Sequence, residues 1–295
     1  MGSPFGPPPS AAHTKSLAES NTSIRFINVS PPVNNSPSKE VHKSVEKFLI
    51  EFIDCHRACV KEAIVKHVLS GSNSTPLAGL VVDFFCTSMI DVGNELGVPS
   101  YLFSPSSAAA VGLLLYLPTP HGREIEEFDG DLLIPSYVNP VPGSGLPEVL
   151  SNKHGGYTTV MNHGRRFKET KGIIVNTFEE LDSHAVKSLM NDFDHVPPVY
   201  TVGPVIVLKG ESNKLVSDET QKDDEIMKWL DHQPDSSVVF LCFGSQGNFG
   251  EEQVKEIAVG LDQTGVRFLW SFGSHHQRIN LKSLVITRVM ISWKS

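Results

Sequence analysis

Short apolar runs alternate with amphipathic stretches along most of the chain. Five of the runs have the length and composition of strands, at residues 24–29, 77–82, 99–103, 172–176 and 199–202. Apolar residues recur at helical spacing in four other stretches, at residues 87–96, 106–117, 157–169 and 179–191. Strands that alternate with helices in this way predict an α/β fold with a doubly wound, mostly parallel sheet.

Two segments interrupt this alternation. Residues 40–69 hold apolar side chains mostly at helical spacing with charged residues between them, which predicts a long surface helix, either straight or bent. Residues 118–150 are rich in proline and glycine and predict a long loop. A loop of that length in a compact domain usually has a function.

Residues 223–271 predict a helix, a strand, a glycine-rich turn, a second helix and a second strand. The run 238–243 is continuously apolar, as a strand covered on both faces must be. After the turn that starts at Gly244 and Ser245, the unpaired N–H groups of the helix begun by Glu251 can stabilise a phosphate, and the Ser245 hydroxyl adds a donor. The glycines do not fit the dinucleotide fingerprint, so a tight turn without a ligand explains the pattern as well.

The composition is that of a soluble globular protein with one large domain or two ordinary ones. Of the 295 residues, 40% are hydrophobic and 20% are charged. The net charge of −8 argues against a nucleic-acid partner, and the longest apolar run, residues 108–117, is too short to span a membrane. The start MGSPFGPPPS shows neither a signal peptide nor a myristoylation motif, so we expect a cytoplasmic protein.

The four cysteines predict reduced, buried thiols rather than a metal site. Cys55 and Cys59 lie four residues apart on one helix face, but no second pair completes a zinc site. Cys86 and Cys242 fall in segments that are expected to be buried.

Residues 273–295 differ in composition from the rest of the chain. They include four Lys or Arg residues and no Asp or Glu. A basic amphipathic tail that binds a membrane or a nucleic acid is one interpretation. We favour the other, in which the tail is read out of frame or through an unspliced intron.

Asp83 is the candidate for chemistry in the first part of the chain. It ends an apolar strand, so its carboxylate is expected at the carboxyl edge of the parallel sheet, where ligands bind in such folds. Its position alone favours the alternative, a helix N-cap or a structural carboxylate in a loop.

Three separated segments resemble plant family 1 UDP-dependent glycosyltransferases of the flavonoid and triterpenoid type. In the family's order they are LVVDFFCTSMIDVGNELGVPSYLFSPSSA, GIIVNTFEELDSHAV and MKWLDHQPDSSVVFLCFGSQGNFGEEQVKEIAVGLDQTGVRFLWS. The resemblance covers roughly residues 14–272 and implies a GT-B fold. It implies four regions: a nearly complete Rossmann-like acceptor domain at 1–203, a linker at 204–221, the first βα unit of the UDP-sugar domain at 222–272 and an aberrant tail at 273–295.

The resemblance also implies an activity, the transfer of a sugar, expected to be glucose, from a UDP-sugar to a hydroxyl of a plant secondary metabolite with inversion. In the family, the aspartate that matches Asp83 orients a catalytic histidine, which takes the proton of the acceptor hydroxyl. The other matching residues are Phe84, Phe85 and Phe103 for the acceptor pocket and Gly244 and Ser245 for the pyrophosphate. The implied partners are an aglycone and the co-substrate UDP-glucose, with no cofactor and no metal, and we expect a monomer.

Two parts of the family's pattern have no match in this chain. Members begin with a strand and a loop of the kind PxxGH that carries the catalytic histidine, whereas His13 lies in a segment that resembles a later part of the family. A sugar-nucleotide signature, of the kind WAPQ followed by HCGWNS, should follow Trp270. We therefore expect a chain truncated at both ends that is inactive by itself. A non-catalytic small-molecule-binding remnant and an unstable truncated product are the alternatives.

Overall fold

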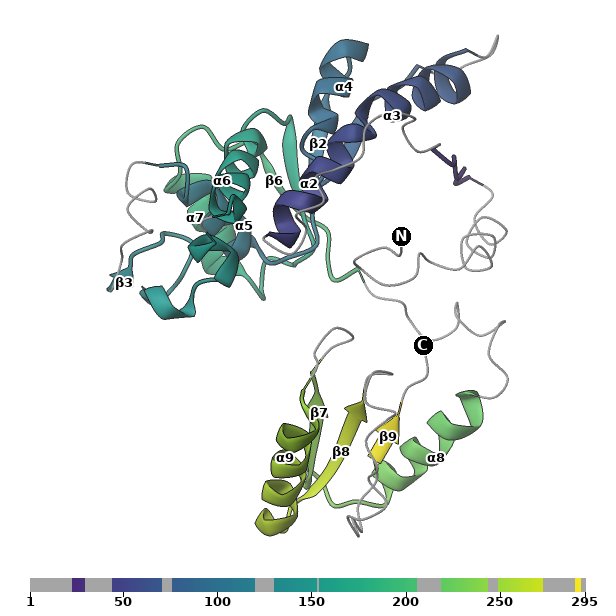
Figure 1. Cartoon of the computed structure of the whole chain (residues 1–295), viewed down its shortest axis with the longest axis vertical. Coiled ribbons are helices and arrows are strands. Elements are labelled where there is room, and N and C mark those ends of the chain that lie inside the picture. Colours follow the sequence, from purple (N-terminus) through teal and green to yellow (C-terminus); the bar gives the residue numbers. More distant parts are fainter. Residues whose placement is uncertain are drawn as a thin grey trace. The chain divides into compact units, whose positions relative to one another are not determined.

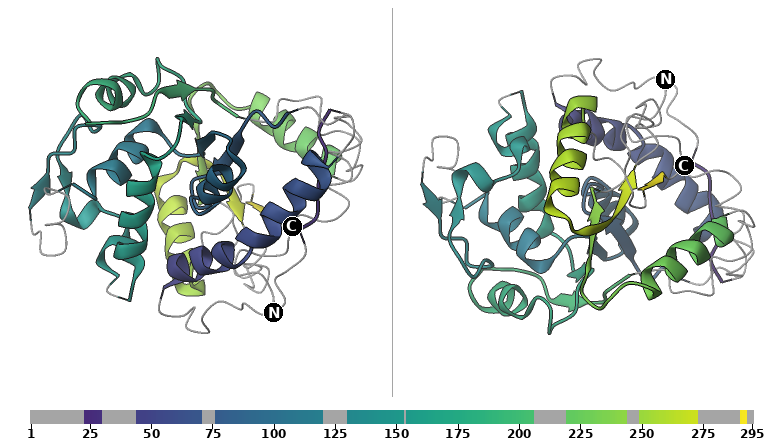
Figure 2. Two further views of the ribbon diagram at one scale, coloured as in Figure 1. Left: turned by 90° about the horizontal axis from the view of Figure 1, so that it is seen from above. Right: turned by 90° about the horizontal axis from the view of Figure 1, so that it is seen from below.

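The chain divides into two compact units, Met1–Ile206 and Val207–Ser295. A computed structural model describes residues 23–29, 44–70, 76–119, 130–152, 154–205, 219–243, 249–272 and 290–292. Figure 1 labels their helices and strands, and Figure 2 shows the same ribbon from two other directions.

Unit 1 contains a sheet of four parallel strands in the order β1-β2-β5-β6. The strands are β1 (Leu80–Asp83), β2 (Ser100–Ser104), β5 (Gly172–Val175) and β6 (Val199–Thr201). Four of the predicted strands are thus confirmed to within a few residues. The fifth prediction was wrong, because residues 24–29 form no strand and no described strand pairs with them.

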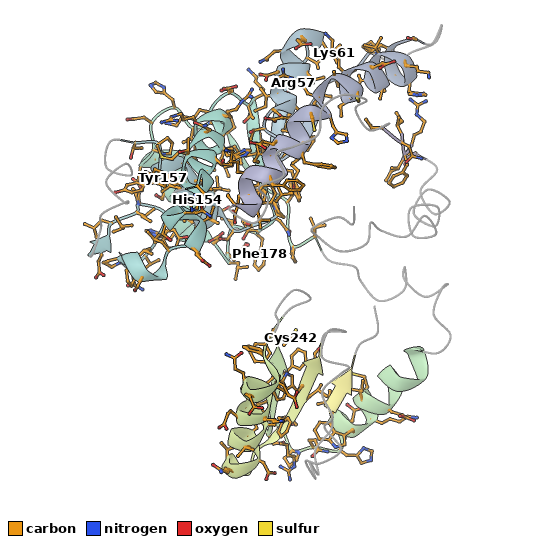
Figure 3. All side chains as sticks on the ribbon, in the orientation of Figure 1. Arg57, Lys61, His154, Tyr157, Phe178 and Cys242 are labelled. Carbon is orange, nitrogen blue, oxygen red and sulfur yellow. The ribbon has the colours of Figure 1, made fainter. Side chains whose placement is uncertain are left out.

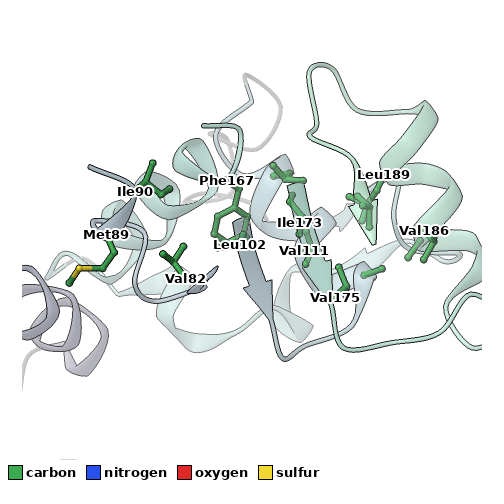
Figure 4. Close-up of a cluster of buried hydrophobic side chains, with 14 of the residues drawn as sticks. Val82, Met89, Ile90, Leu102, Val111, Phe167, Ile173, Val175, Val186 and Leu189 are labelled. Atoms are coloured by element: carbon green, nitrogen blue, oxygen red, sulfur yellow. The ribbon is translucent and has the colours of Figure 1, made fainter. Parts of the chain in front are cut away.

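The helices that connect these strands share one face of the sheet. They are α4 (Met89–Leu96) after β1, α5 (Ala108–Tyr116) and α6 (Gly156–Phe167) after β2, and α7 (Ser183–Asn191) after β5. The strand order advances in one direction, so right-handed crossovers place all of these helices on the same side. The buried core lies between them and the sheet, where Val82, Leu102 and Ile173 of the strands meet Val111 and Phe167 of the helices (Figure 4).

The long helix predicted for residues 40–69 is broken. It consists of α2 (Val45–Cys55), α3 (Arg57–Ile64) and the π-helical turn η1 (Val65–Leu69), and none of its residues is buried. The Ser44 hydroxyl caps the start of α2 by accepting a hydrogen bond from the Lys47 N–H at 3.2 Å. The interruption lies at His56, where the chain turns between α2 and α3.

The long loop predicted for residues 118–150 has more structure than its composition indicates. It contains the antiparallel pair β3 (Asp131–Leu132) and β4 (Val141–Pro142) and the short 3₁₀ helices η3 (Gly143–Gly145) and η4 (Glu148–Ser151). Leu132, Ile134 and Leu150 form a second buried cluster with residues of α5 and α6. The burial of these three side chains is the physical reason that residues 130–151 are held in place, and residues 120–129 lie outside the described part of the chain.

Unit 2 contains a parallel sheet in the order β7-β8-β9. Its elements are α8 (Glu219–Asp231), β7 (Val238–Cys242), α9 (Glu251–Thr264), β8 (Arg267–Phe272) and β9 (Met290–Ser292). Val254 and Ala258 of α9 pack against Phe268 and Trp270 of β8. The predicted order of helix, strand, helix and strand is confirmed, while most of the predicted glycine-rich turn lies outside the described residues.

The tail contributes one described strand, β9, which pairs in parallel with β8; the aberrant origin of residues 273–295 stays a prediction. One expectation for unit 2 needs correction. Strand β7 was expected to be covered on both faces, but 61% of Phe240 is exposed. Among the described residues β7 has one neighbour, β8, so it is an edge strand and its faces are only partly covered.

Candidate functional site

Asp83 stands at the carboxyl edge of the unit 1 sheet, as predicted. It is the last residue of β1, its side chain is exposed, and the parallel register pairs it with Phe103 of β2. Paired residues point to the same side of a sheet, so the carboxylate and the Phe103 ring lie side by side. Phe84 and Phe85 follow at once, with ring centroids 3.9 Å apart at an interplanar angle of 39°.

The loop after β1 is organised by Asp83 itself. Its Oδ1 accepts a hydrogen bond from the Phe85 N–H at 3.0 Å, and its carbonyl oxygen accepts one from the Cys86 N–H at 2.7 Å. This Asx turn is the structural role that the position alone favours. A carboxylate has further acceptor sites, so the exposed side chain can also bind a donor from a ligand or a catalytic group.

A buried hydrogen bond ties this loop to α6. The Thr87 hydroxyl and His163 Nδ1 lie 2.7 Å apart, and both residues are buried. Burial lowers the pKa of His163 to about 4, with the positive charge of Arg166 also lowering it and the carboxylate of Asp54 opposing the shift. The imidazole is therefore neutral at neutral pH and serves as a hydrogen-bonding anchor for the loop.

Two further polar residues at this edge were not predicted from the sequence. Asn176, directly after β5, accepts a hydrogen bond from the Val205 N–H through its Oδ1 at 2.7 Å and donates one from Nδ2 to the Pro105 carbonyl at 3.5 Å. An Asp182 carboxylate oxygen accepts a hydrogen bond from the Ala108 N–H at the start of α5 at 2.5 Å. Asn176 could have been identified from the sequence, because it is a polar residue directly after a predicted buried strand. Phe178, labelled in Figure 3, is 38% exposed two residues further on.

The predicted pyrophosphate contacts, Gly244 and Ser245, lie outside the described residues. The helix that follows them, α9, has Gly250 as its N-cap, whose N–H donates a hydrogen bond to Gln253 Oε1 at 3.0 Å. Glu251 and Glu252 occupy the first turn of this helix. Their negative charge is partly neutralised by Lys255, but it reduces the attraction of the helix start for a phosphate.

The structure thus brings together the predicted residues of the first unit. A cleft of about 460 Å³ lies elsewhere, between α3 and α4, and its lining includes Arg57, Lys61 and Glu95. Arg57 pairs with Asp91 at 2.7 Å and Lys61 with Glu95 at 2.6 Å, so these charges stabilise the contact of the two helices (Figure 3 labels Arg57 and Lys61). The predicted acceptor residues do not border this cleft.

The four cysteines are free, but they are less buried than the sequence predicted. Cys55, Cys59 and Cys86 are half-buried and Cys242, labelled in Figure 3 on β7, is exposed. Burial raises the pKa of the Cys86 thiol to about 11, and Asp83 contributes to the shift.

Within the described ranges, no group of three or more His, Cys, Asp or Glu side chains could hold a metal ion. None of the helices in the described part of the chain combines the length and hydropathy that a bilayer crossing requires.

Comparison with known proteins identifies close relatives. UDP-glycosyltransferase 71K1 of Malus domestica is 49% identical over 267 residues, which are 88% of this chain and 55% of the relative. The crystal structure of Medicago truncatula UGT71G1 complexed with UDP-glucose has a TM-score of 0.78 and 40% identity, and the match covers 95% of this chain and 61% of that one. A UGT transferase from Siraitia grosvenorii in complex with UDP has a TM-score of 0.71 and 32% identity, with 97% of this chain and 70% of that one covered.

The chain spans about half the length of the curated relatives that it matches. No protein-family model matches it. The structural neighbours confirm the α/β fold of GT-B type that was predicted from the sequence. At these identities and coverages, the chain belongs to the plant UDP-dependent glycosyltransferases.

Proposed function

We propose that this chain is part of an enzyme that transfers glucose from UDP-glucose to a hydroxyl of a plant secondary metabolite, with inversion at the anomeric carbon. The proposal is supported by the names of the relatives, which include a UDP-glucose flavonoid 3-O-glucosyltransferase of Fragaria ananassa. It is also supported by a related structure in complex with UDP-2fluoro-glucose and pterostilbene, from Phytolacca americana. The chain's own part in the reaction is to provide the acceptor side of the site.

The observation that carries the proposal is the position of Asp83. Its exposed carboxylate lies at the carboxyl edge of a parallel sheet, beside Phe103 and directly before Phe84 and Phe85. Aromatic rings next to one carboxylate suit a flat phenolic acceptor that must lose a proton. The cytosolic location and the monomeric state that the sequence favours stay predictions.

In the proposed reaction, Asp83 holds an imidazole in the orientation needed for proton transfer and stabilises its cation. The imidazole takes the proton of the acceptor hydroxyl as the oxygen attacks the anomeric carbon. The bond from this carbon to the UDP oxygen breaks, and UDP leaves with the electron pair. The Ser245 hydroxyl and the N–H groups near Gly244 stabilise the charge that develops on the pyrophosphate.

Within the described residues, no histidine hydrogen-bonds Asp83, whose Oδ1 accepts instead from the Phe85 N–H. We therefore expect no transfer of glucose by this chain alone, because the loss of general-base catalysis costs about 10²- to 10⁴-fold in rate. The same observation favours a second candidate function, the binding of a small molecule without catalysis. Sugar transfer by the chain alone, lost in Asp83→Ala, would contradict this expectation.

A chimera tests the proposed function directly. The 267 matched residues of the Malus domestica relative would be replaced by those of this chain, and transfer from UDP-glucose to a flavonol would be followed by chromatography. We expect a chimera that transfers glucose, with a rate at least about 100-fold lower in its Asp83→Ala variant. The matched control is Asp131→Ala, which removes an exposed aspartate of β3 and should leave the rate unchanged. Equal activity of the two variants would exclude the role given to Asp83.

A further inference from the structure

The last described part of unit 1 is the exit segment, residues 202–205, which is tied to the turn that follows β5. The Val202 N–H continues the pairing of β6 with β5 by donating a hydrogen bond to the Val175 carbonyl at 3.0 Å. The Gly203 N–H donates one to the Thr177 carbonyl at 2.8 Å. Unit 1 ends one residue after this segment, so the chain leaves the unit here.

The Asn176 side chain reaches the same segment. Asn176 lies at the centre of a tight three-residue turn, in which the Thr177 N–H donates a hydrogen bond to the Val175 carbonyl at 2.8 Å. Its Oδ1 accepts a hydrogen bond from the Val205 N–H at 2.7 Å, and its Nδ2 donates one to the Pro105 carbonyl at 3.5 Å. One side chain therefore connects the segments that follow β2, β5 and β6.

Hydrogen bonds, rather than buried side chains, hold the exit segment. Its three N–H groups are all bonded, since Pro204 has none. Two of the bonds go to backbone carbonyls, and the third, from Val205, goes to the Asn176 side chain. Val202 is 50% and Val205 62% exposed, so burial of apolar surface contributes little. The position of the end of this segment therefore depends on one side chain.

The exit segment also lies closer to this turn than a side chain would permit. A Cβ added at Gly203 would lie 2.6 Å from the Thr177 nitrogen and 2.7 Å from the Asn176 carbonyl carbon. Both are backbone atoms, which cannot move aside as the end of a flexible side chain can. The close approach of the two backbone segments thus requires glycine at this point.

These contacts lie at the edge of the sheet that carries the candidate acceptor residues. The parallel register pairs Phe103 with Asp83 on one side and with Ile174 on the other. Asn176 follows Ile174 by two residues, at the carboxyl end of the same strand. The chain therefore leaves unit 1 at the edge at which Asp83 stands.

We propose that Asn176 is a positioning residue, which fixes the direction in which the chain leaves unit 1, and that glucose transfer depends on it. The second part rests on the proposed function, in which Asp83 of unit 1 and Ser245 of unit 2 take part in one reaction. The exit segment leads to unit 2, so a change in its direction changes where that unit begins. A displacement of about 1 Å far from the reacting atoms can slow an enzyme about 100-fold.

The first test measures the hold on the segment in the full chain, by hydrogen exchange of single amides in NMR spectra. Asn176→Leu keeps the branching of the side chain and removes both polar atoms, whereas Asn176→Asp keeps an oxygen that can accept from Val205. The Val205 N–H should exchange about 5- to 10-fold faster in the leucine variant and at nearly the wild-type rate in the aspartate variant. The Val202 N–H, which is bonded to the backbone, should exchange equally in all three proteins.

The second test measures transfer in the chimera with the Malus domestica relative. Asn176→Leu should lower kcat at least about 10-fold and change the KM values for UDP-glucose and the flavonol less than about twofold. Asn176→Asp should restore most of kcat. The matched control is Asn191→Leu at the end of α7 that leads into β6, where the Asn191 Nδ2 donates a hydrogen bond within its own helix to the Lys187 carbonyl at 2.8 Å.

Four results would overturn the proposal: unchanged exchange of Val205 in Asn176→Leu, unchanged kcat in that variant, a loss of kcat that Asn176→Asp does not restore, or an equal loss in Asn191→Leu. Asn176→Ala carries the same expectations and covers the case in which the leucine variant fails to fold. An inactive unmodified chimera would contradict the proposed function and, with it, the dependence of transfer on Asn176. The exchange of Val205 would still decide whether Asn176 holds the exit segment, so the two failures are distinguishable.

Discussion

Acidification should destabilise unit 1 through a single histidine. His163 is buried and neutral, with its Nδ1 2.7 Å from the Thr87 hydroxyl, and its pKa falls from 6.5 to about 4. The charged groups that affect it are Asp54, which favours the protonated imidazole, and Arg166, which disfavours it. In the unfolded chain the imidazole takes up a proton near its ordinary pKa, so acid favours unfolding.

The direction and the size of the pH effect on stability follow from the pKa of His163 in the unfolded chain, 6.5, and in the folded chain, about 4. Because the folded pKa is lowered, the contribution of His163 is fully present above about pH 6.5 and is lost as the pH falls toward 4. Between pH 7 and pH 5 this loss amounts to about 2 kcal/mol in the free energy of unfolding. Below pH 4 both states bind the proton and the loss no longer grows.

The assay compares the wild-type chain with His163→Gln, which keeps a hydrogen-bonding side chain and removes the titration. Hydrogen exchange of the slowest amides of α6 would report the free energy of opening at pH 7 and pH 5. The wild type should lose about 2 kcal/mol more than the variant over this interval. Equal losses in the two proteins, or a His163 resonance that titrates near pH 6.5 in the folded state, would refute the reasoning.

Three shorter predictions concern packing, charge and donor binding. Gly164→Ala should lower the melting temperature, because the added Cβ would lie 1.9 Å from the Leu114 carbonyl oxygen. Such a clash costs about 1–3 kcal/mol of stability. Gly260→Ala is the control and should be neutral or slightly stabilising, because its Cβ would have no atom within 4 Å. Asp91→Asn should lower the free energy of unfolding, measured in urea, by about 1 kcal/mol, because it weakens the paired hydrogen bonds from Arg166. An unchanged urea midpoint would show that solvent screens these bonds. Calorimetric titration with UDP should give no saturable binding below millimolar concentration, because a helix start contributes only about 1–2 kcal/mol and a millimolar complex needs about 4 kcal/mol. A micromolar dissociation constant would show a donor site that these residues do not supply.

The local elements followed from the sequence because their signals are local. Apolar runs located four of the strands of unit 1, helical spacing located α4 to α7 to within a few residues, and the glycine-rich turn located the start of α9. The same reading placed Asp83 at the carboxyl edge, since the end of a parallel strand fixes that position. It failed for residues 24–29, which have strand composition but pair with none of the strands that the structure describes.

The contacts between distant segments appeared only in the folded chain. Thr87 and His163 are 76 residues apart, and Asp91 joins α4 to Arg57 of α3 and Arg166 of α6. No spacing rule relates such residues, because their separation depends on how the crossovers stack the helices on the sheet.

The sequence by itself determined the family, the order of strands and helices and the carboxylate at the sheet edge. Tertiary structure decided which face of each strand is covered. In β2 the face with Ser100, Leu102 and Ser104 is buried, while the face with Tyr101 and Phe103 is only partly covered, although it is the more apolar of the two. The physical reason is that the apolar composition of a strand predicts that it will be buried but not on which face. The direction in which the crossovers wind determines which face of the sheet the helices cover.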